Sequence, residues 1–174
     1  PYESNGIDDY NTKARQIVTK MLDGKSDEEI AKYSFVIFNE PDGIWYTNKV
    51  DQMCNDWLTI YTTIKDICPD AKVAGPNFSV YNSSAYQKFF AFCKTNNCLP
   101  EYITWHELQK DKLTRLASHC KEVKGYVETY YAGSLIEQVI FVNETVNFDD
   151  VGNPGALVNW LSIFDEEDVY ASLP

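Results

Sequence analysis

Five short apolar segments alternate with longer amphipathic patterns along this 174-residue chain. The apolar segments predict β-strands at residues 35–38, 72–76, 102–105, 136–142 and 169–171. Such short, nearly continuous apolar runs are typical of parallel strands buried on both faces, and parallel strands need a helix-length crossover between them. The alternation therefore predicts an α/β fold with a parallel sheet.

Between these strands, apolar residues recur at helical spacing, and capping residues mark several of the helix starts. Ser26, with Glu29 three residues later, matches the capping box of a short helix. Ser83 or Ser84 is predicted to cap a helix that runs through Cys93, and Pro154 opens the last helix. No internal repeat or linker interrupts the pattern, so residues 1–174 are predicted to form a single domain.

Two architectures fit this pattern, an open doubly wound sheet and part of a (β/α)₈ TIM barrel. No glycine-rich phosphate loop follows any strand, which weakens the nucleotide-binding form of the doubly wound sheet. Several strands do end in polar residues that can take part in chemistry: Glu40, Asn77, His106 and Glu144. In a barrel, catalytic side chains lie at these carboxyl ends of the strands.

Two of these residues are carboxylates that directly follow apolar strands. Glu40 follows the segment 34–39, and Glu144 follows the segment 138–143. An ionised carboxylate at the end of a buried strand needs charged or hydrogen-bonding partners, since otherwise it becomes neutral. Two such groups suggest an acid and a nucleophile that face each other across a sugar, the arrangement used in glycoside hydrolysis.

The charge of the chain limits the classes of partner. The net charge is -11 and the pI is about 4.5. These values argue against nucleic acid and against anionic membrane surfaces, both of which bind basic patches, and they are compatible with a neutral substrate. The sequence contains no apolar run near 18 residues and no recognisable targeting segment, so neither a membrane span nor a location is predicted.

The five cysteines have an odd count and irregular spacing, which does not resemble a disulfide framework. The absence of a CxxC pair or a Cys/His cluster argues against a structural zinc site, and no metal is predicted. Cys93 and Cys98 bracket a polar Lys-Thr-Asn-Asn turn. The sequence leaves open whether these two cysteines form a bridge or remain free buried thiols.

The segment Phe38-Asn39-Glu40-Pro41-Asp42 resembles the acid/base motif of clan A glycoside hydrolases, where an Asn-Glu pair ends the fourth barrel strand. The clan's nucleophile is a glutamate that ends the seventh strand, a position that Glu144 matches. Residues 73–76 and 103–106 then correspond to the fifth and sixth strands. Within the clan, these motifs look most like glycoside hydrolase family 39, which includes β-xylosidases and α-L-iduronidases.

The resemblance implies a retaining glycosidase without a cofactor, acting on a carbohydrate. Glu144 would attack the anomeric carbon while Glu40 protonates the leaving oxygen, and Asn39 would contact the sugar 2-hydroxyl. The chain would supply roughly strands 4 to 8 of the barrel, and the other strands would come from another chain or from the parent polypeptide. The alternative is a catalytically inactive carbohydrate-binding or scaffolding barrel fragment.

Five further residues are candidates for substrate binding. His106 would hydrogen-bond the substrate or orient a carboxylate, although a purely structural histidine fits the pattern equally well. Glu107 would add a third carboxylate to the site, and Asn77 would contact the substrate from the end of its strand. Trp45 and Trp105 are candidate platforms on which a sugar ring would stack.

Overall fold

The computed structural model describes residues 2–43, 45–108, 113–131, 139–142 and 148–172. It contains a parallel sheet whose five strands follow one another in chain order. The strands are β1 (Ser34–Val36), β2 (Lys72–Phe78), β3 (Tyr102–Trp105), β4 (Val139–Val142) and β5 (Ala171–Ser172). The prediction of an α/β fold with parallel strands is confirmed, and the strand order has no switch point of the kind that a doubly wound sheet requires.

Six α-helices lie in the described residues: α1 (Tyr2–Leu22), α2 (Asp27–Ile30), α3 (Val50–Ile67), α4 (Ser83–Thr95), α5 (Leu113–Tyr130) and α6 (Pro154–Glu166). A short 3₁₀ turn, η1 (Phe148–Asp150), precedes α6. The predicted capping box of Ser26 and Glu29 is present. The predicted cap of α4 was wrong, because Asn82 rather than either serine accepts the hydrogen bond, from the backbone N–H of Ala85 at 3.1 Å.

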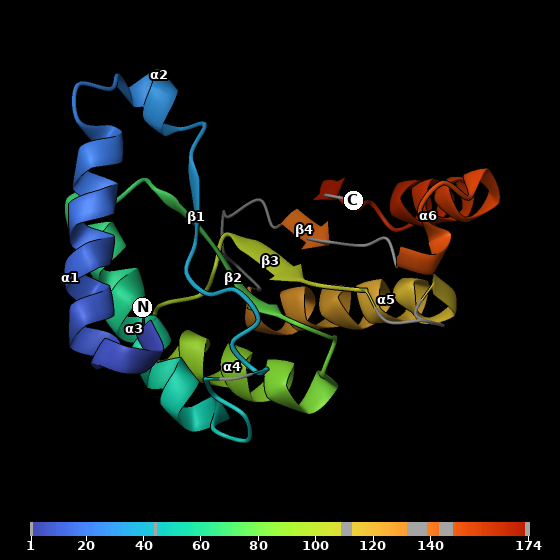
Figure 1. Ribbon diagram of the computed structural model, residues 1–174, viewed down its shortest axis with the longest axis horizontal. Coiled ribbons are helices and arrows are strands. Elements are labelled where there is room, and N and C mark those ends of the chain that lie inside the picture. Colours follow the sequence, from blue (N-terminus) through green and yellow to red (C-terminus); the bar gives the residue numbers. More distant parts are fainter. Residues whose placement is uncertain (1, 44, 109–112, 132–138, 143–147, 173–174) are drawn as a thin grey trace.

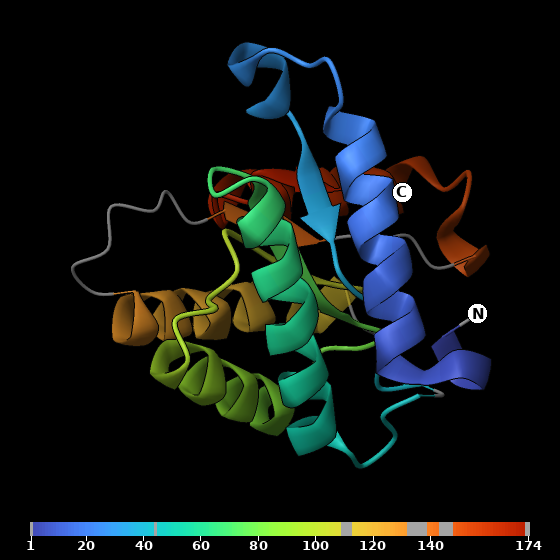
Figure 2. The same ribbon diagram turned by 90° about the vertical axis from the view of Figure 1, so that its left-hand side faces the viewer.

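The longer helices follow one another around one side of the sheet. α1 packs on α3, α3 on α4, α4 on α5 and α5 on α6, and Figures 1 and 2 show these helices as an arc outside the strands. No helix in the described part of the chain covers the opposite face of the sheet (Figure 1). The described molecule is therefore a two-layer α/β segment that is curved in the sense of a barrel wall.

The hydrophobic core lies between the sheet and this arc of helices. Trp57 of α3, Phe89 and Phe90 of α4, and Trp105 of β3 are each fully buried there. Gly75 of β2 lies directly under the Trp57 ring, where an added Cβ would stand 2.4 Å from a ring carbon. Glycine at this position thus allows a large aromatic side chain to pack against the strand backbone.

Apolar side chains remain exposed at both ends of the segment. Leu157, Val158 and Leu161 of α6 are half-exposed or more, whereas Ala156 and Trp160 of the same helix are buried. At the other end, Val36 of the edge strand β1 is 46% exposed. None of the helices in the described ranges is sufficiently long and apolar to cross a membrane.

Candidate functional site

The segment that carries Glu40 is tied to the end of the neighbouring strand. Glu40 has a left-handed backbone (φ 46°), and its N–H donates to the carbonyl oxygen of Asn77 at 3.0 Å. The Asp42 carboxylate accepts two hydrogen bonds from Ser79, from the backbone N–H at 2.8 Å and from the hydroxyl at 2.9 Å. These hydrogen bonds hold the turn at the carboxyl end of the sheet.

The opposite end of this segment is anchored by α1. The phenol of Tyr10 donates a hydrogen bond to the carbonyl oxygen of Ile37, two residues before Asn39. Burial raises the pKa of Tyr10, so the phenol stays protonated and remains a donor. Helix α1 thus contributes to the placement of Glu40 although it contributes no side chain next to it in the described contacts.

A bulge in β2 turns the Asn77 side chain towards Asn39 and His106. The register between β2 and β3 shifts between Pro76 and Phe78, and Asn77 has a left-handed backbone (φ 61°). Bulges of this kind re-aim a side chain and occur often next to active sites. The fully buried Asn77 donates from Nδ2 to Asn39 Oδ1 at 3.1 Å, and the same atom lies 3.1 Å from Nε2 of His106.

His106 connects Asn77 to Glu40. Its backbone N–H continues the β2–β3 pairing by donating to Phe78 O at 2.9 Å, its side chain is fully buried, and its Nδ1 lies 2.9 Å from Glu40 Oε1. With the Asn77 amide donating to Nε2, the proton of a neutral imidazole is placed on Nδ1, and Nδ1–H donates to the Glu40 carboxylate. The four side chains of Asn39, Glu40, Asn77 and His106, here called the strand-end network, form one hydrogen-bonded chain.

The strand-end network is buried at its base and open at its tip. Asn77 and His106 are fully buried, whereas the Glu40 side chain is 42% exposed and Asn39 is exposed. A carboxyl group held by a buried donor, yet open to solvent, is able to exchange a proton with an external molecule without losing its orientation. The arrangement is therefore suited to acid–base chemistry on a bound ligand.

Two predicted site residues lie elsewhere. Trp105 is fully buried on the helix side of the sheet, next to Tyr81 and Tyr86, so the predicted sugar-stacking role of Trp105 was wrong. Glu107 is 1% exposed and accepts hydrogen bonds from Trp105 Nε1 and from His119 Nδ1, each at 2.8 Å. The carboxylate of Glu107 thus points towards α5, whereas the side chain of His106 points towards Glu40. Adjacent residues of an extended chain point to opposite faces.

His119 is the residue that sequence reasoning missed. The helical pattern assigns no role to it, yet its ring stacks on Tyr81 at 4.2 Å between ring centroids and contacts the buried carboxylate of Glu107. This contact joins α5 to the end of β3, next to His106. The sequence carries no local signal for the pair, since its two members belong to different elements.

The remaining predicted residues are Trp45 and Glu144. Trp45 is partly buried and packs against the hydrophobic core, so only part of its ring is available to a ligand. Glu144 lies outside the described residues. The last residue of β4, Val142, pairs with Trp105, the last residue of β3. The two strands therefore end at the same edge of the sheet, next to His106. No group of three or more potential metal ligands occurs among the residues that the structure describes.

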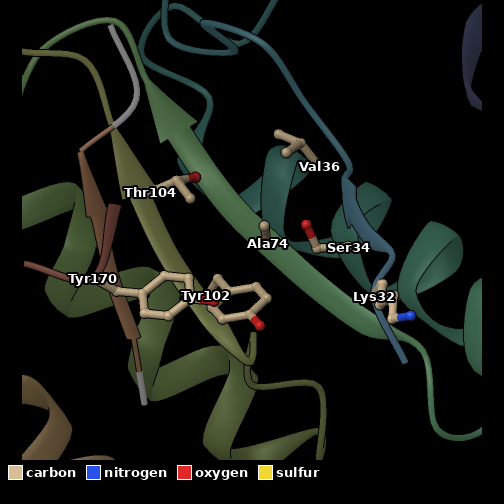
Figure 3. A pocket seen from close by; sticks show the side chains of 7 residues that line it. All are labelled: Lys32, Ser34, Val36, Ala74, Tyr102, Thr104 and Tyr170. Atoms are coloured by element: carbon tan, nitrogen blue, oxygen red, sulfur yellow. The ribbon is translucent and has the colours of Figure 1, made fainter. Parts of the chain in front are cut away.

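A cavity of about 210 Å³ lies on the uncovered face of the sheet, apart from the strand-end network. Figure 3 shows Val36, Ala74 and Thr104 on three neighbouring strands, with the rings of Tyr102 and Tyr170 face to face beside them. Ser34 and Lys32 close the cavity at the start of β1. Its walls include no residue of the strand-end network, so it is a feature of the sheet face and not of the candidate site.

Comparison with curated proteins finds two glycosidases that match nearly the whole chain. A 3-O-beta-L-arabinopyranosyl-alpha-L-arabinofuranosidase of Bifidobacterium pseudocatenulatum is 29% identical to this chain over an alignment 191 residues long. The alignment covers 96% of this chain and 19% of that protein. A 3-O-alpha-D-galactosyl-alpha-L-arabinofuranosidase of Bifidobacterium longum subsp. longum is 25% identical and covers 94% of this chain. The chain is related to glycoside hydrolases. It spans less than a fifth of the length of each of these relatives.

Solved structures show the same relationship in the fold. N2152 from Neocallimastix frontalis superposes on 97% of this chain with a TM-score of 0.81 and 27% identity. A GH39 β-xylosidase from Caulobacter crescentus superposes on 95% with a TM-score of 0.75 and 15% identity. The chain covers 40% and 38% of these structures, so its fold is that of part of a glycoside hydrolase barrel. No protein-family model matches the chain.

Proposed function

We propose that this chain forms the catalytic part of a retaining glycoside hydrolase, with Glu40 as the acid/base and Glu144 as the nucleophile. The observation that carries the proposal is the strand-end network. It holds a partly exposed carboxyl group at the carboxyl ends of parallel strands, directly after an asparagine, and fixes it through a buried histidine. This is the position and the support that a proton donor needs in a barrel enzyme.

The reaction has two steps. In the first, a carboxylate oxygen of Glu144 bonds to the anomeric carbon, the glycosidic bond breaks, and Glu40 gives its proton to the leaving oxygen. In the second, Glu40 takes a proton from water, and the resulting hydroxide oxygen displaces Glu144 from the sugar. Both steps proceed through an oxocarbenium-like transition state, and the configuration at the anomeric carbon is retained.

His106 and Asn77 have separate parts in this cycle. The Nδ1–H of His106 donates to Oε1 of Glu40, which leaves the second carboxyl oxygen of Glu40 to carry the mobile proton. Asn77 keeps the histidine in this tautomer and also orients the side chain of Asn39. The Asn39 amide then offers a fixed hydrogen-bonding group to the substrate next to the acid.

The substrate is a neutral glycan, and an arabinofuranoside is favoured. The chain carries a net charge of -11, which disfavours acidic sugars through repulsion. Both curated relatives are named for hydrolysis at α-L-arabinofuranosyl residues. We therefore expect the strand-end network to act on a pentose that carries no charge.

The five strands correspond to strands 4 to 8 of a (β/α)₈ barrel, and the first three strands belong to the parent polypeptide or a companion chain. Support comes from the cavity in Figure 3 and from exposed Val36, because the inside of a closed barrel is filled by layers of side chains. The coverage of 38–40% of the similar structures also supports this proposal.

The acid/base assignment is tested by Glu40→Ala in the full-length parent protein, with Glu28→Ala as the matched control. Glu28 is an exposed residue of α2 that pairs only with Lys32 in the described contacts. Hydrolysis of glycosides with poor leaving groups should fall steeply in the Glu40 variant, whereas activated aryl glycosides should retain the first step, and added azide should restore turnover. Equal loss on both kinds of substrate, without azide rescue, would contradict the assignment and favour a non-catalytic sugar-binding role.

A further inference from the structure

The carboxyl end of α4 brings two cysteines together through its backbone. After the last helical residue, Thr95, the chain passes through Asn97 in the left-handed conformation (φ 53°). The N–H of Cys98 then turns back to donate to the carbonyl oxygen of Cys93 at 2.9 Å. This is the 6→1 hydrogen bond of a Schellman motif, in which the side chains at its two ends pack against each other. In this chain both of those side chains are thiols.

The two thiols are fully buried and differ in acidity. The hydrogen bond from Cys93 lowers the pKa of Cys98, whereas burial, followed by that same hydrogen bond, raises the pKa of Cys93. The indole N–H of Trp57 donates to the Cys98 carbonyl at 2.9 Å and fixes the backbone of this residue. Cys98 is thus the more acidic of the two thiols, and Cys93 lies beside it as the second member of a pair.

We propose that Cys93 and Cys98 form a disulfide that closes the end of α4, with a low-molecular-weight disulfide such as oxidised glutathione as the oxidant. The Cys98 thiolate attacks one glutathione sulfur, forms a mixed disulfide and releases one glutathione thiolate. Cys93 loses its proton to that thiolate and attacks the sulfur of Cys98, which releases the second glutathione. Two protein thiols are oxidised, and one oxidised glutathione is reduced to two molecules of reduced glutathione.

The loop between the two cysteines provides the access that this exchange needs. Residues 94–97, the last two residues of α4 and the two that follow it, are exposed and carry only local hydrogen bonds in the described structure. We expect opening of this single turn to expose both sulfurs while β2 and β3 stay paired. Once formed, the disulfide closes a short ring, and the entropy of the unfolded chain falls, so the oxidised protein is more stable than the reduced one.

The test is to unfold and refold the full-length parent protein in buffers with a series of ratios of reduced to oxidised glutathione, quench with acid, and block free thiols with N-ethylmaleimide. Trypsin cleaves after Lys94, between the two cysteines, so the disulfide appears as peptide 89–94 joined to peptide 95–110. We expect this linked pair in the oxidising buffers and its loss with dithiothreitol. The oxidised protein should have a urea midpoint higher by about 1 M than that of the same protein after reduction.

Cys54→Ser is the matched control, because Cys54 is also a buried thiol and interacts electrostatically with Cys93. This variant should still give the 93–98 link and the midpoint shift, and Cys98→Ser should abolish both. The proposal is overturned if both thiols are alkylated at every glutathione ratio, or if Cys98 links to Cys54 instead. The comparison of oxidised with reduced wild-type protein needs no variant, so poor folding of a cysteine variant does not affect the conclusion.

Discussion

Asn77→Asp is the substitution that most sharply separates the proposed role of the strand-end network from ordinary core packing. The two side chains have nearly the same shape, but the donor atom Nδ2 is replaced by an acceptor oxygen. At 3.1 Å from His106 Nε2, that oxygen requires a proton on Nε2. A neutral imidazole with its proton on Nε2 then presents a lone pair, instead of an N–H, to Glu40 Oε1 at 2.9 Å.

The expected cost follows from the interaction that is lost. A hydrogen bond to an ionised carboxylate contributes about 1.5–3 kcal/mol, and about 1.4 kcal/mol corresponds to a tenfold change in rate. If His106 orients Glu40 for proton transfer, kcat/KM on glycosides with poor leaving groups should fall by about ten- to a hundredfold. Substrates that need no acid should be affected less, because the first step on them does not use the Glu40 proton.

The assay is steady-state hydrolysis of paired aryl glycosides by the full-length parent protein. Asn82→Asp is the matched control, since it adds the same charge at an exposed helix cap that aspartate fills equally well. The reasoning is refuted if Asn77→Asp and Asn82→Asp give the same kcat/KM on both substrates. It is also refuted if Asn77→Asp lowers the rate on both substrates by the same factor.

Three further outcomes are expected. Gly75→Ala should lower the free energy of unfolding by about 1–3 kcal/mol in urea denaturation, because the added Cβ would stand 2.4 Å from a Trp57 ring carbon. The loss should be smaller in a Trp57→Leu background, and an unchanged loss there would contradict the contact. Burial raises the pKa of Cys54 and of Cys120 to about 12, so both thiols should resist iodoacetamide at pH 8 and react only as the pH approaches 12. The partly exposed Cys68 should react before them, and fast labelling of Cys54 would contradict its burial in the core. The chain alone should self-associate in sedimentation velocity, because apolar surface is exposed at both ends of the sheet. A stable monomer of 20.0 kDa would contradict the proposal that three further strands complete the barrel.

The sequence predicts the elements of this fold well because each one has a local cause. Short apolar runs specify the parallel strands, and the capping box of Ser26 marks the start of α2. The cap of α4 was predicted wrongly because three consecutive residues, from Asn82 to Ser84, are all able to cap a helix. Only the backbone position at which the helix begins decides among them.

The candidate site is harder to predict because it depends on direction and on distant contacts. His106 and Glu107 both follow β3, yet adjacent residues of an extended chain point to opposite faces, and the register with β2 determines which one joins Glu40. Glu107 finds its partner, His119, on a later helix. The aim of Asn77 depends on a bulge that no residue pattern announces.

The central claim is tested most directly by trapping the glycosyl-enzyme intermediate in the full-length parent protein. A 2-fluoro glycoside with a good leaving group, first of the arabinofuranosyl type, slows both steps but lets the first proceed, so the covalent intermediate accumulates. Peptide mass spectrometry of the trapped protein should find the sugar on Glu144, and the product of slow turnover should retain its configuration. A label on Glu107, an unlabelled protein with a confirmed substrate, or a product of inverted configuration would contradict the account.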